Sequence, residues 1–201
     1  KKYGQIPLPK YIKRKTNADD IKRYQTTYAS INGSVAAPTA GLHFTKEILN
    51  KLSRKGILIE YLTLHVTYNT FKPIKTNNYM KHDIGSEYCE IESTLINKIK
   101  NVKENNKKVY AVGTTTTRAL ESYYTNSIKG NFKGEVDLYI TPGYKFKIID
   151  GLITNFHLPK STLLLLVSSL IGVDILLSIY KVAIQHEYRF YSYGDSMLIK
   201  S

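Results

Sequence analysis

The sequence predicts an α/β fold, a layered α/β/α domain built around a mixed sheet. Short runs of β-branched and aromatic residues, such as 57–66 and 108–112, alternate along the chain with segments of helical periodicity, such as 93–103. This alternation is typical of layered α/β domains. The length of 201 residues suits one domain, or one domain with part of another, and allows a substantial buried core.

Helices are predicted where apolar residues recur every three or four positions. A capping side chain or a helix-breaking glycine stands at one end of most of these segments. In chain order they are 17–28, capped by Asn17; 45–55, capped by Thr45 and ended by Gly56; 93–103, with Leu95, Ile96 and Ile99 inward; 114–122, which follows Gly113; 161–171, capped by Ser161; and 173–186, which follows Gly172.

Strands are predicted where β-branched and aromatic residues gather between turn-forming residues. The run 57–66 is the longest and is expected to be buried. The dipeptide Asp150-Gly151 is typical of a two-residue turn and predicts a hairpin between the runs on either side. In chain order the expected strands are 57–66, 88–91, 108–112, 136–140, 145–149 and 152–155.

Residues 1–14 combine two prolines with basic side chains. Proline forces the residue before it into extended conformations, which favours a connection over a helix or strand. We therefore expect 1–14 to arrive from an earlier part of the protein, whose N-terminal portion this chain lacks. The α/β domain itself is expected over 15–201.

The net charge of +13 favours a polyanionic partner such as nucleic acid. A general enrichment in Lys, Asn and Ile is the alternative explanation. The single cysteine, Cys89, excludes an internal disulfide and fits a reducing compartment, so we expect a cytoplasmic protein. The longest apolar run lies between Lys160 and Asp174 and is too short to span a bilayer, so no membrane partner is expected.

Two segments have the composition of ligand-binding loops. The first, 33–44, is rich in small residues that allow close approach to the backbone, and it offers Ser34, Thr39, Gly41 and His43. A structural turn with a satisfied histidine is the alternative. The second begins at Gly113, where a strand runs into a helix whose free N–H groups can bind an anion. Ordinary helix capping is the alternative for its members, Thr114, Thr115, Thr116, Thr117 and Arg118.

The third segment, 154–162, places Asn155 and His157 on either side of Phe156. An aromatic ring with flanking polar groups suits the binding of a planar base, although a structural histidine is the commoner case. Weaker candidates are His65, at a strand end, and Asp195, between glycine and serine. No metal site is expected, because the histidines lack the spacing of known zinc motifs.

Several segments along the chain have long and chemically unusual patterns: GQIPLPKYI, RYQTTYA, GSVAAPTAGLHFT, TLHV, NTFKPI, HDIGSEY, AVGTTTTRALES, PGYKFKIIDGLITNFHLPKSTLLLLVSSLIG and YRFYSYGDSMLI. Through them, nearly the whole chain resembles the S-adenosylmethionine:tRNA ribosyltransferase-isomerase family of queuosine biosynthesis. The family pattern differs at Thr67, Asn69 and Gly85, where it usually has glycine, glycine and histidine.

The resemblance implies a layered α/β domain interrupted by a small β-barrel, which would precede residue 1, so that 1–14 would leave it. It also implies transfer and rearrangement of the ribosyl group of S-adenosylmethionine onto 7-aminomethyl-7-deazaguanine at the wobble position of tRNA. Epoxyqueuosine in tRNA, adenine and methionine would be the products. S-adenosylmethionine would be a consumed substrate, with no further cofactor, and a monomer acting on tRNA with a queuosine-type anticodon is expected.

We expect His43 or His157 to act as the base. Thr114–Thr117 with Arg118 would hold the methionine carboxylate or the ribose hydroxyls, and the guanidinium of Arg118 suits a carboxylate. Two other functions fit the residues: a non-catalytic RNA-binding fragment, or an α/β enzyme acting on a free nucleotide-like metabolite. The expected substrate-binding set is Ser34, Thr39, Gly41, His65, Gly113, Thr114, Thr115, Thr116, Thr117, Asn155, Phe156 and Asp195.

Overall fold

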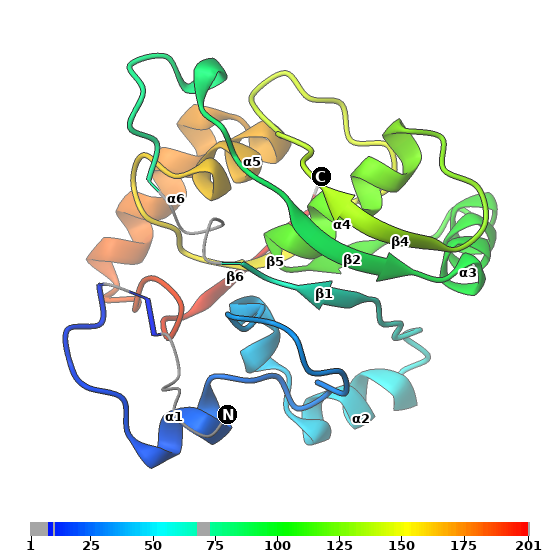
Figure 1. Cartoon of the computed structure of the whole chain (residues 1–201), viewed down its shortest axis with the longest axis horizontal. Helices are drawn as coiled ribbons and strands as arrows, with labels where there is room; N and C mark the ends of the chain where they lie inside the picture. The colour runs from blue at the N-terminus through cyan, green and yellow to red at the C-terminus, as the bar shows by residue number, and fades with distance from the viewer. Residues whose placement is uncertain (1–7, 10, 68–72, 201) are drawn as a thin grey trace.

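The computed structural model describes residues 8–9, 11–67 and 73–200. Their strands form two three-stranded sheets, with helices packed between and around them (Figure 1). The antiparallel sheet has the order β1-β2-β4, from β1 (Thr63–His65), β2 (Glu87–Ile91) and β4 (Phe132–Val136). The mixed sheet has the order β3-β5-β6, with β3 (Tyr110–Val112) parallel to β5 (Gly151–Asn155) and β6 (Ser196–Lys200) antiparallel to β5.

Helix α4 (Thr114–Thr125) holds the two sheets together. It contacts β3 and β5 of the mixed sheet and β4 of the antiparallel sheet, and all its residues from 117 to 123 are buried. The layered α/β class is thereby confirmed, with two small sheets in place of one, and the described residues form no closed barrel. The core around α4 includes Ile91, Leu95, Ile96, Ala119, Leu120, Leu152, Leu166, Val167 and Leu176.

Five of the six helices follow the predicted positions closely. Thr45 and Ser161 act as the caps, because each hydroxyl accepts a hydrogen bond from a backbone N–H three residues on, at 3.3 and 3.2 Å. The helices are α2 (Lys46–Arg54), α3 (Ser93–Glu104), α4, α5 (Thr162–Ile171) and α6 (Val173–Gln185), and the short 3-10 turns are η1 (Thr39–His43) and η3 (Tyr79–Lys81).

Helix α1 (Ala18–Arg23) is shorter than the predicted 17–28. Asn17 caps it as expected, but the helix stops at Tyr24. The ring of Tyr24 is buried and packs 5.6 Å from the ring of Tyr193. This long-range contact outweighs the helical periodicity of the following residues.

The predicted hairpin over 145–155 is wrong. Only its second half forms a strand, β5, which pairs with β3 and β6 instead. The backbone N–H groups of Lys147, Ile148 and Ile149 donate to the carboxylate of Glu121, at 2.8 to 3.1 Å. Glu121 is fully buried in α4. The polar backbone of 147–149 is therefore satisfied by a side chain, and no strand partner is needed.

Two predicted strands differ in their bounds from the strands of the structure. The run 57–66 forms a strand only over Thr63–His65, because Thr63 already pairs with Glu90, one residue before β2 ends. The side chains of Ile57 and Leu58 are 49% and 58% exposed. The strand expected over 136–140 is wrong, because β4 ends at Val136 and residues 137–140 form no strand. Past that point the carbonyl of Leu138 accepts from Arg118 instead of a neighbouring strand.

Among the described residues, no single helix is long and apolar enough to cross a membrane. Helices α5 and α6 reach the required length only as a pair, and the chain bends by 111° between them. Gly172 forms this bend with a φ of +86°, in the region that favours glycine.

Candidate functional site

The three predicted ligand-binding segments meet in one pocket. Strands β3 and β5 are parallel, so their carboxyl ends lie at the same edge of the sheet, where α/β proteins bind ligands. The cavity is open to solvent and measures about 50 Å³, well below the roughly 300–1,000 Å³ of a typical ligand pocket. Its lining consists of Tyr11, Ala37, Pro38, Thr39, Ala40, Val66, Gly113, Thr114, Thr115, Thr154, Asn155, Phe156, His157, Leu158, Ser161, Leu163, Tyr191 and Ser192.

The N-terminus of α4 faces the pocket through two of its four threonines. Gly113 turns the chain from β3 into α4 with a φ of +92°, and Thr114 and Thr115 line the cavity. Thr116 points to a different groove. Thr117 is fully buried, and its hydroxyl donates to the Gly113 carbonyl at 3.2 Å. The structure therefore separates the four threonines into two that line this pocket and two that do not.

Asn155, at the end of β5, connects three parts of the site. Its Oδ1 accepts from the hydroxyl of Thr39 at 2.9 Å. Its Nδ2 lies 3.2 Å from Nε2 of His43 and 3.4 Å from the carbonyl oxygen of Asp195. Because that carbonyl can only accept, the amide must present its nitrogen there. Asn155 thus holds η1, β5 and the 188–195 loop in fixed positions.

The same network assigns the neutral tautomer of His43. Nε2 receives the amide hydrogen of Asn155, so the ring proton belongs on Nδ1. Burial lowers the pKa of His43, while the charge of Asp195 and a contact with the backbone of Gly194 act in the opposite direction. His43 does not line the cavity. In this geometry His43 meets the pocket only through its contact with Asn155.

His157 is the histidine that lines the cavity. Its Nε2 lies 2.7 Å from the hydroxyl of Thr154, and its backbone N–H donates to the hydroxyl of Tyr180 at 2.6 Å. Burial lowers the pKa of His157 to about 4. The ring is therefore neutral at pH 7. Its Nε2 can either donate to the Thr154 hydroxyl or accept from it, depending on which ring nitrogen carries the proton.

The lowered pKa of His157 predicts an acid-sensitive fold. Histidine in an unfolded chain has a pKa of about 6.5, above the value of about 4 in the fold, so on acidification the unfolded state binds the proton first. Stability is full above pH 6.5 and is lost as the pH falls towards 4. Between pH 7.5 and 5 we expect a loss of up to about 2 kcal/mol in the free energy of unfolding.

Urea unfolding at these two pH values checks this expectation. His157→Gln, which cannot titrate, should remove most of the loss. His186→Gln changes an exposed histidine at the end of α6 and serves as the matched control. Equal pH dependence in wild type and His157→Gln would show that another group is responsible.

Arg118 does not reach the pocket. Its side chain is 2% exposed and forms a buried ion pair with Glu87 at 2.7 Å. Its Nε donates to the carbonyl of Leu138 at 2.9 Å, and Nη2 lies 3.4 Å from the carbonyl of Val136. The carboxylate-binding role expected for Arg118 does not fit this position. The guanidinium joins β2 to the segment that follows β4.

Phe156 lines the pocket, but its ring is packed into an aromatic cluster. The residue is 3% exposed, and its ring packs against those of Tyr180, Tyr188 and Phe190, with centroids 4.9 to 5.8 Å apart. Stacking on a base needs a free face, which this cluster does not leave. The cluster anchors the chain between Asn155 and His157, which also line the pocket.

The remaining predicted residues lie outside the pocket lining, and three of them make contacts within the loops of the site. Ser34 accepts from the N–H of Val66 at 2.9 Å, and a side chain at Gly41 would collide with Tyr28. The carboxylate of Asp195 pairs with Arg189 at 2.7 Å. His65 lies on β1, with its ring 5.4 Å from that of Tyr88 and outside the pocket.

Sequence reasoning missed Tyr11, Tyr191 and Ser192, which form one wall of the pocket. Tyr191 has a φ of +74°, unusual for a bulky side chain. No local pattern indicates this wall, because it forms between segments 180 residues apart. Residues 1–7, 10, 68–72 and 201 lie outside the described part, and they include Asn69 and most of the expected connection 1–14. In the described ranges, no three His, Cys, Asp or Glu side chains cluster as metal ligands would.

The pocket lies at the strand ends of a mixed sheet. It is lined by the N-terminus of α4 and by Asn155 and His157. This arrangement defines a ligand-binding α/β domain of the kind found in enzymes. The sequence matches the profile of the queuosine biosynthesis protein family over residues 1–199. The chain belongs to this family.

Curated relatives of high identity carry the name S-adenosylmethionine:tRNA ribosyltransferase-isomerase. The protein of Halothermothrix orenii is 56% identical over 198 residues, which cover 98% of this chain and 57% of the relative. That of Rickettsia bellii is 49% identical, with 98% and 56% covered. The crystal structure of S-adenosylmethionine tRNA ribosyltransferase from Thermotoga maritima is similar with a TM-score of 0.65 and 37% identity, over 80% of this chain and 51% of that one. The chain thus spans a little over half the length of these relatives.

Proposed function

We propose that the complete gene product is a tRNA-modifying transferase-isomerase that uses S-adenosylmethionine as a consumed substrate. It would transfer and rearrange the ribosyl group onto 7-aminomethyl-7-deazaguanine at the tRNA wobble position, releasing adenine and methionine. The observation that carries the proposal is that the three predicted ligand-binding segments meet in one pocket. The names of relatives up to 56% identical support it.

The chemistry requires a base, because a proton next to the sulfonium must be removed before the ribose rearranges. His157 supports this role by geometry, since it is the histidine that lines the cavity. Its pKa of about 4 makes it a weak base in the empty site. An anionic substrate group, such as the methionine carboxylate, would raise that pKa on binding. Thr114 and Thr115 at the N-terminus of α4 would hold this carboxylate.

Adenine release from S-adenosylmethionine tests the proposal directly. The complete gene product is incubated with tRNA that carries the 7-aminomethyl-7-deazaguanine base and, as the control, with the same tRNA carrying guanine. We expect release of adenine and methionine with the first tRNA only. Release with neither tRNA, together with retained tRNA binding, would favour a non-catalytic RNA-binding protein. Turnover without tRNA would favour an enzyme of free metabolites.

A further inference from the structure

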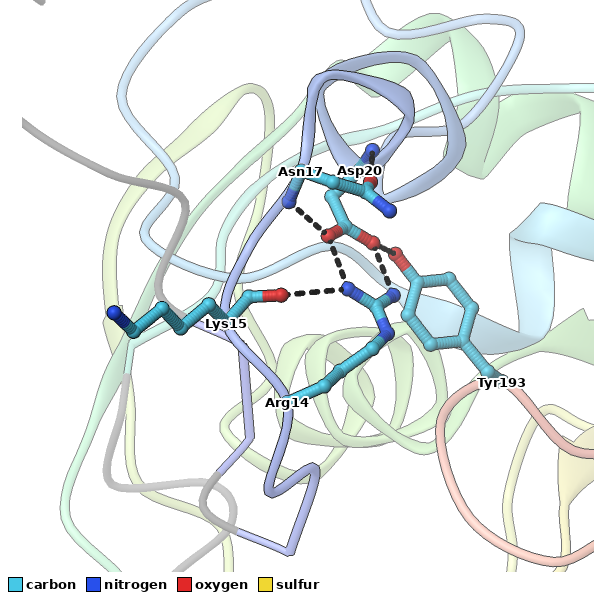
Figure 2. Close-up of polar contacts among 5 residues, drawn as sticks. All are labelled: Arg14, Lys15, Asn17, Asp20 and Tyr193. Carbon is cyan, nitrogen blue, oxygen red and sulfur yellow. Dashed lines mark hydrogen bonds and ion pairs between the residues drawn. The ribbon is translucent and has the colours of Figure 1, made fainter.

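A buried carboxylate joins two distant parts of the chain (Figure 2). Asp20, in α1, is 1% exposed. Arg14 donates to both of its oxygens at 2.6 Å, the N–H of Asn17 donates to Oδ2 at 2.9 Å, and the hydroxyl of Tyr193 donates to Oδ1 at 3.0 Å. Each oxygen accepts two hydrogen bonds. These bonds, led by Arg14, hold the pKa of Asp20 far below its usual range.

Tyr193 belongs to the 188–195 loop, which lies alongside the N-terminal residues (Figure 1). Its ring packs against Tyr24, and the guanidinium of Arg23 lies 5.8 Å from its centroid. The neighbouring N–H of Ser192 donates to the hydroxyl of Tyr11 at 2.7 Å. The loop is therefore held from one side by polar and aromatic contacts from residues 11–24.

The held loop carries a strained residue that lines the pocket. Tyr191 adopts a φ of +74°, a conformation that persists only when surrounding contacts enforce it. Its N–H donates to the carbonyl of Phe156 at 2.9 Å, which ties it to the strand end. Its ring lies 4.9 Å from that of Tyr11. Tyr11, Tyr191 and Ser192 together make up the pocket wall that the N-terminal residues share with the loop.

We propose that Asp20 is a positioning residue for substrate binding, which holds Tyr193 so that Tyr191 and Ser192 form the pocket wall. The carboxylate does not touch the pocket itself. The carboxylate acts through its hydrogen bond with the Tyr193 hydroxyl. Tyr193 is two residues after Tyr191 in the same loop. The inference rests on the proposed function, because the wall is taken to contact S-adenosylmethionine.

Two variants of the complete gene product test the proposal. Asp20→Asn removes the negative charge to which both Arg14 and Tyr193 donate hydrogen bonds. Tyr193→Phe removes only the hydroxyl and keeps the ring. For both, we expect amide hydrogen exchange at Ser192 to become about tenfold faster, while α3 keeps its protection. The KM for S-adenosylmethionine should rise about tenfold, with kcat within about threefold of wild type.

Glu60→Gln is the matched control, because it breaks an ion pair with Lys98 at 2.7 Å away from the pocket. It should leave both the exchange at Ser192 and the KM unchanged. Unchanged exchange in Tyr193→Phe would overturn the proposal, and so would faster exchange with an unchanged KM. If Asp20→Asn fails to fold, Tyr193→Phe decides alone. Absence of adenine release by the wild type would sink the proposed function, and the exchange measurement would still decide whether Asp20 holds the loop.

Discussion

Asn155→Ala is expected to lower kcat/KM for adenine release by about 10²-fold, because displacements of about 1 Å in an active site have effects of this size. The substitution removes the amide that faces the pocket. It also takes away the partner of the Thr39 hydroxyl, of His43 Nε2 and of the Asp195 carbonyl. Steady-state kinetics with precursor tRNA and S-adenosylmethionine provides the measurement.

Further substitutions separate the Asn155 network from a general loss of structure. Asn105→Ala removes an exposed amide at the end of α3, and activity should stay within about twofold. If His43 acts by holding Asn155, His43→Ala and Asn155→Ala should be strongly non-additive when combined. Additive losses would show that His43 has a separate role. A loss of less than about fivefold in Asn155→Ala would sink the idea that this residue organises the site.

Arg118→Ala is expected to destabilise the fold by about 3–5 kcal/mol, since it removes one partner of a buried ion pair. Glu87 is 4% exposed and would lose the guanidinium at 2.7 Å. The carbonyl of Leu138 would lose its donor as well. For a protein of this size the melting temperature should fall by about 10 °C. Thermal and urea unfolding measure the effect.

Lys133→Ala is the control for Arg118. Lys133 forms an ion pair with Glu90 at 2.6 Å, but its side chain is 67% exposed, so its removal should change stability far less than the loss of Arg118. Arg118→Lys should recover only part of the loss, because an ammonium cannot reach both the carboxylate and the carbonyls. An Arg118→Ala protein of normal stability with a greatly raised KM for S-adenosylmethionine would instead restore the carboxylate-binding role.

Local sequence determined the helices and the three ligand-binding segments. Thr45, Ser161 and Gly172 mark helix ends through contacts within a few residues, so the caps and the breaking glycine could be recognised without the fold. The segments around Thr39, Gly113 and Asn155 could be recognised in the same way. The parallel pairing of β3 with β5 brings the Gly113 and Asn155 segments together, and the hydrogen bond from Thr39 to Asn155 adds the third segment to the pocket.

Tertiary structure alone decided where polar side chains find their partners. Arg118 reads locally as part of a ligand-binding helix start, but Glu87 lies 31 residues away and turns it into the core. The backbone of 147–149 reads as a strand, but Glu121 accepts its hydrogen bonds across 26 to 28 residues. Asp20 finds Tyr193 across 173 residues. A buried polar group must be paired wherever the fold brings a partner, and such pairings leave no local pattern, whereas caps, turns and apolar periodicity do.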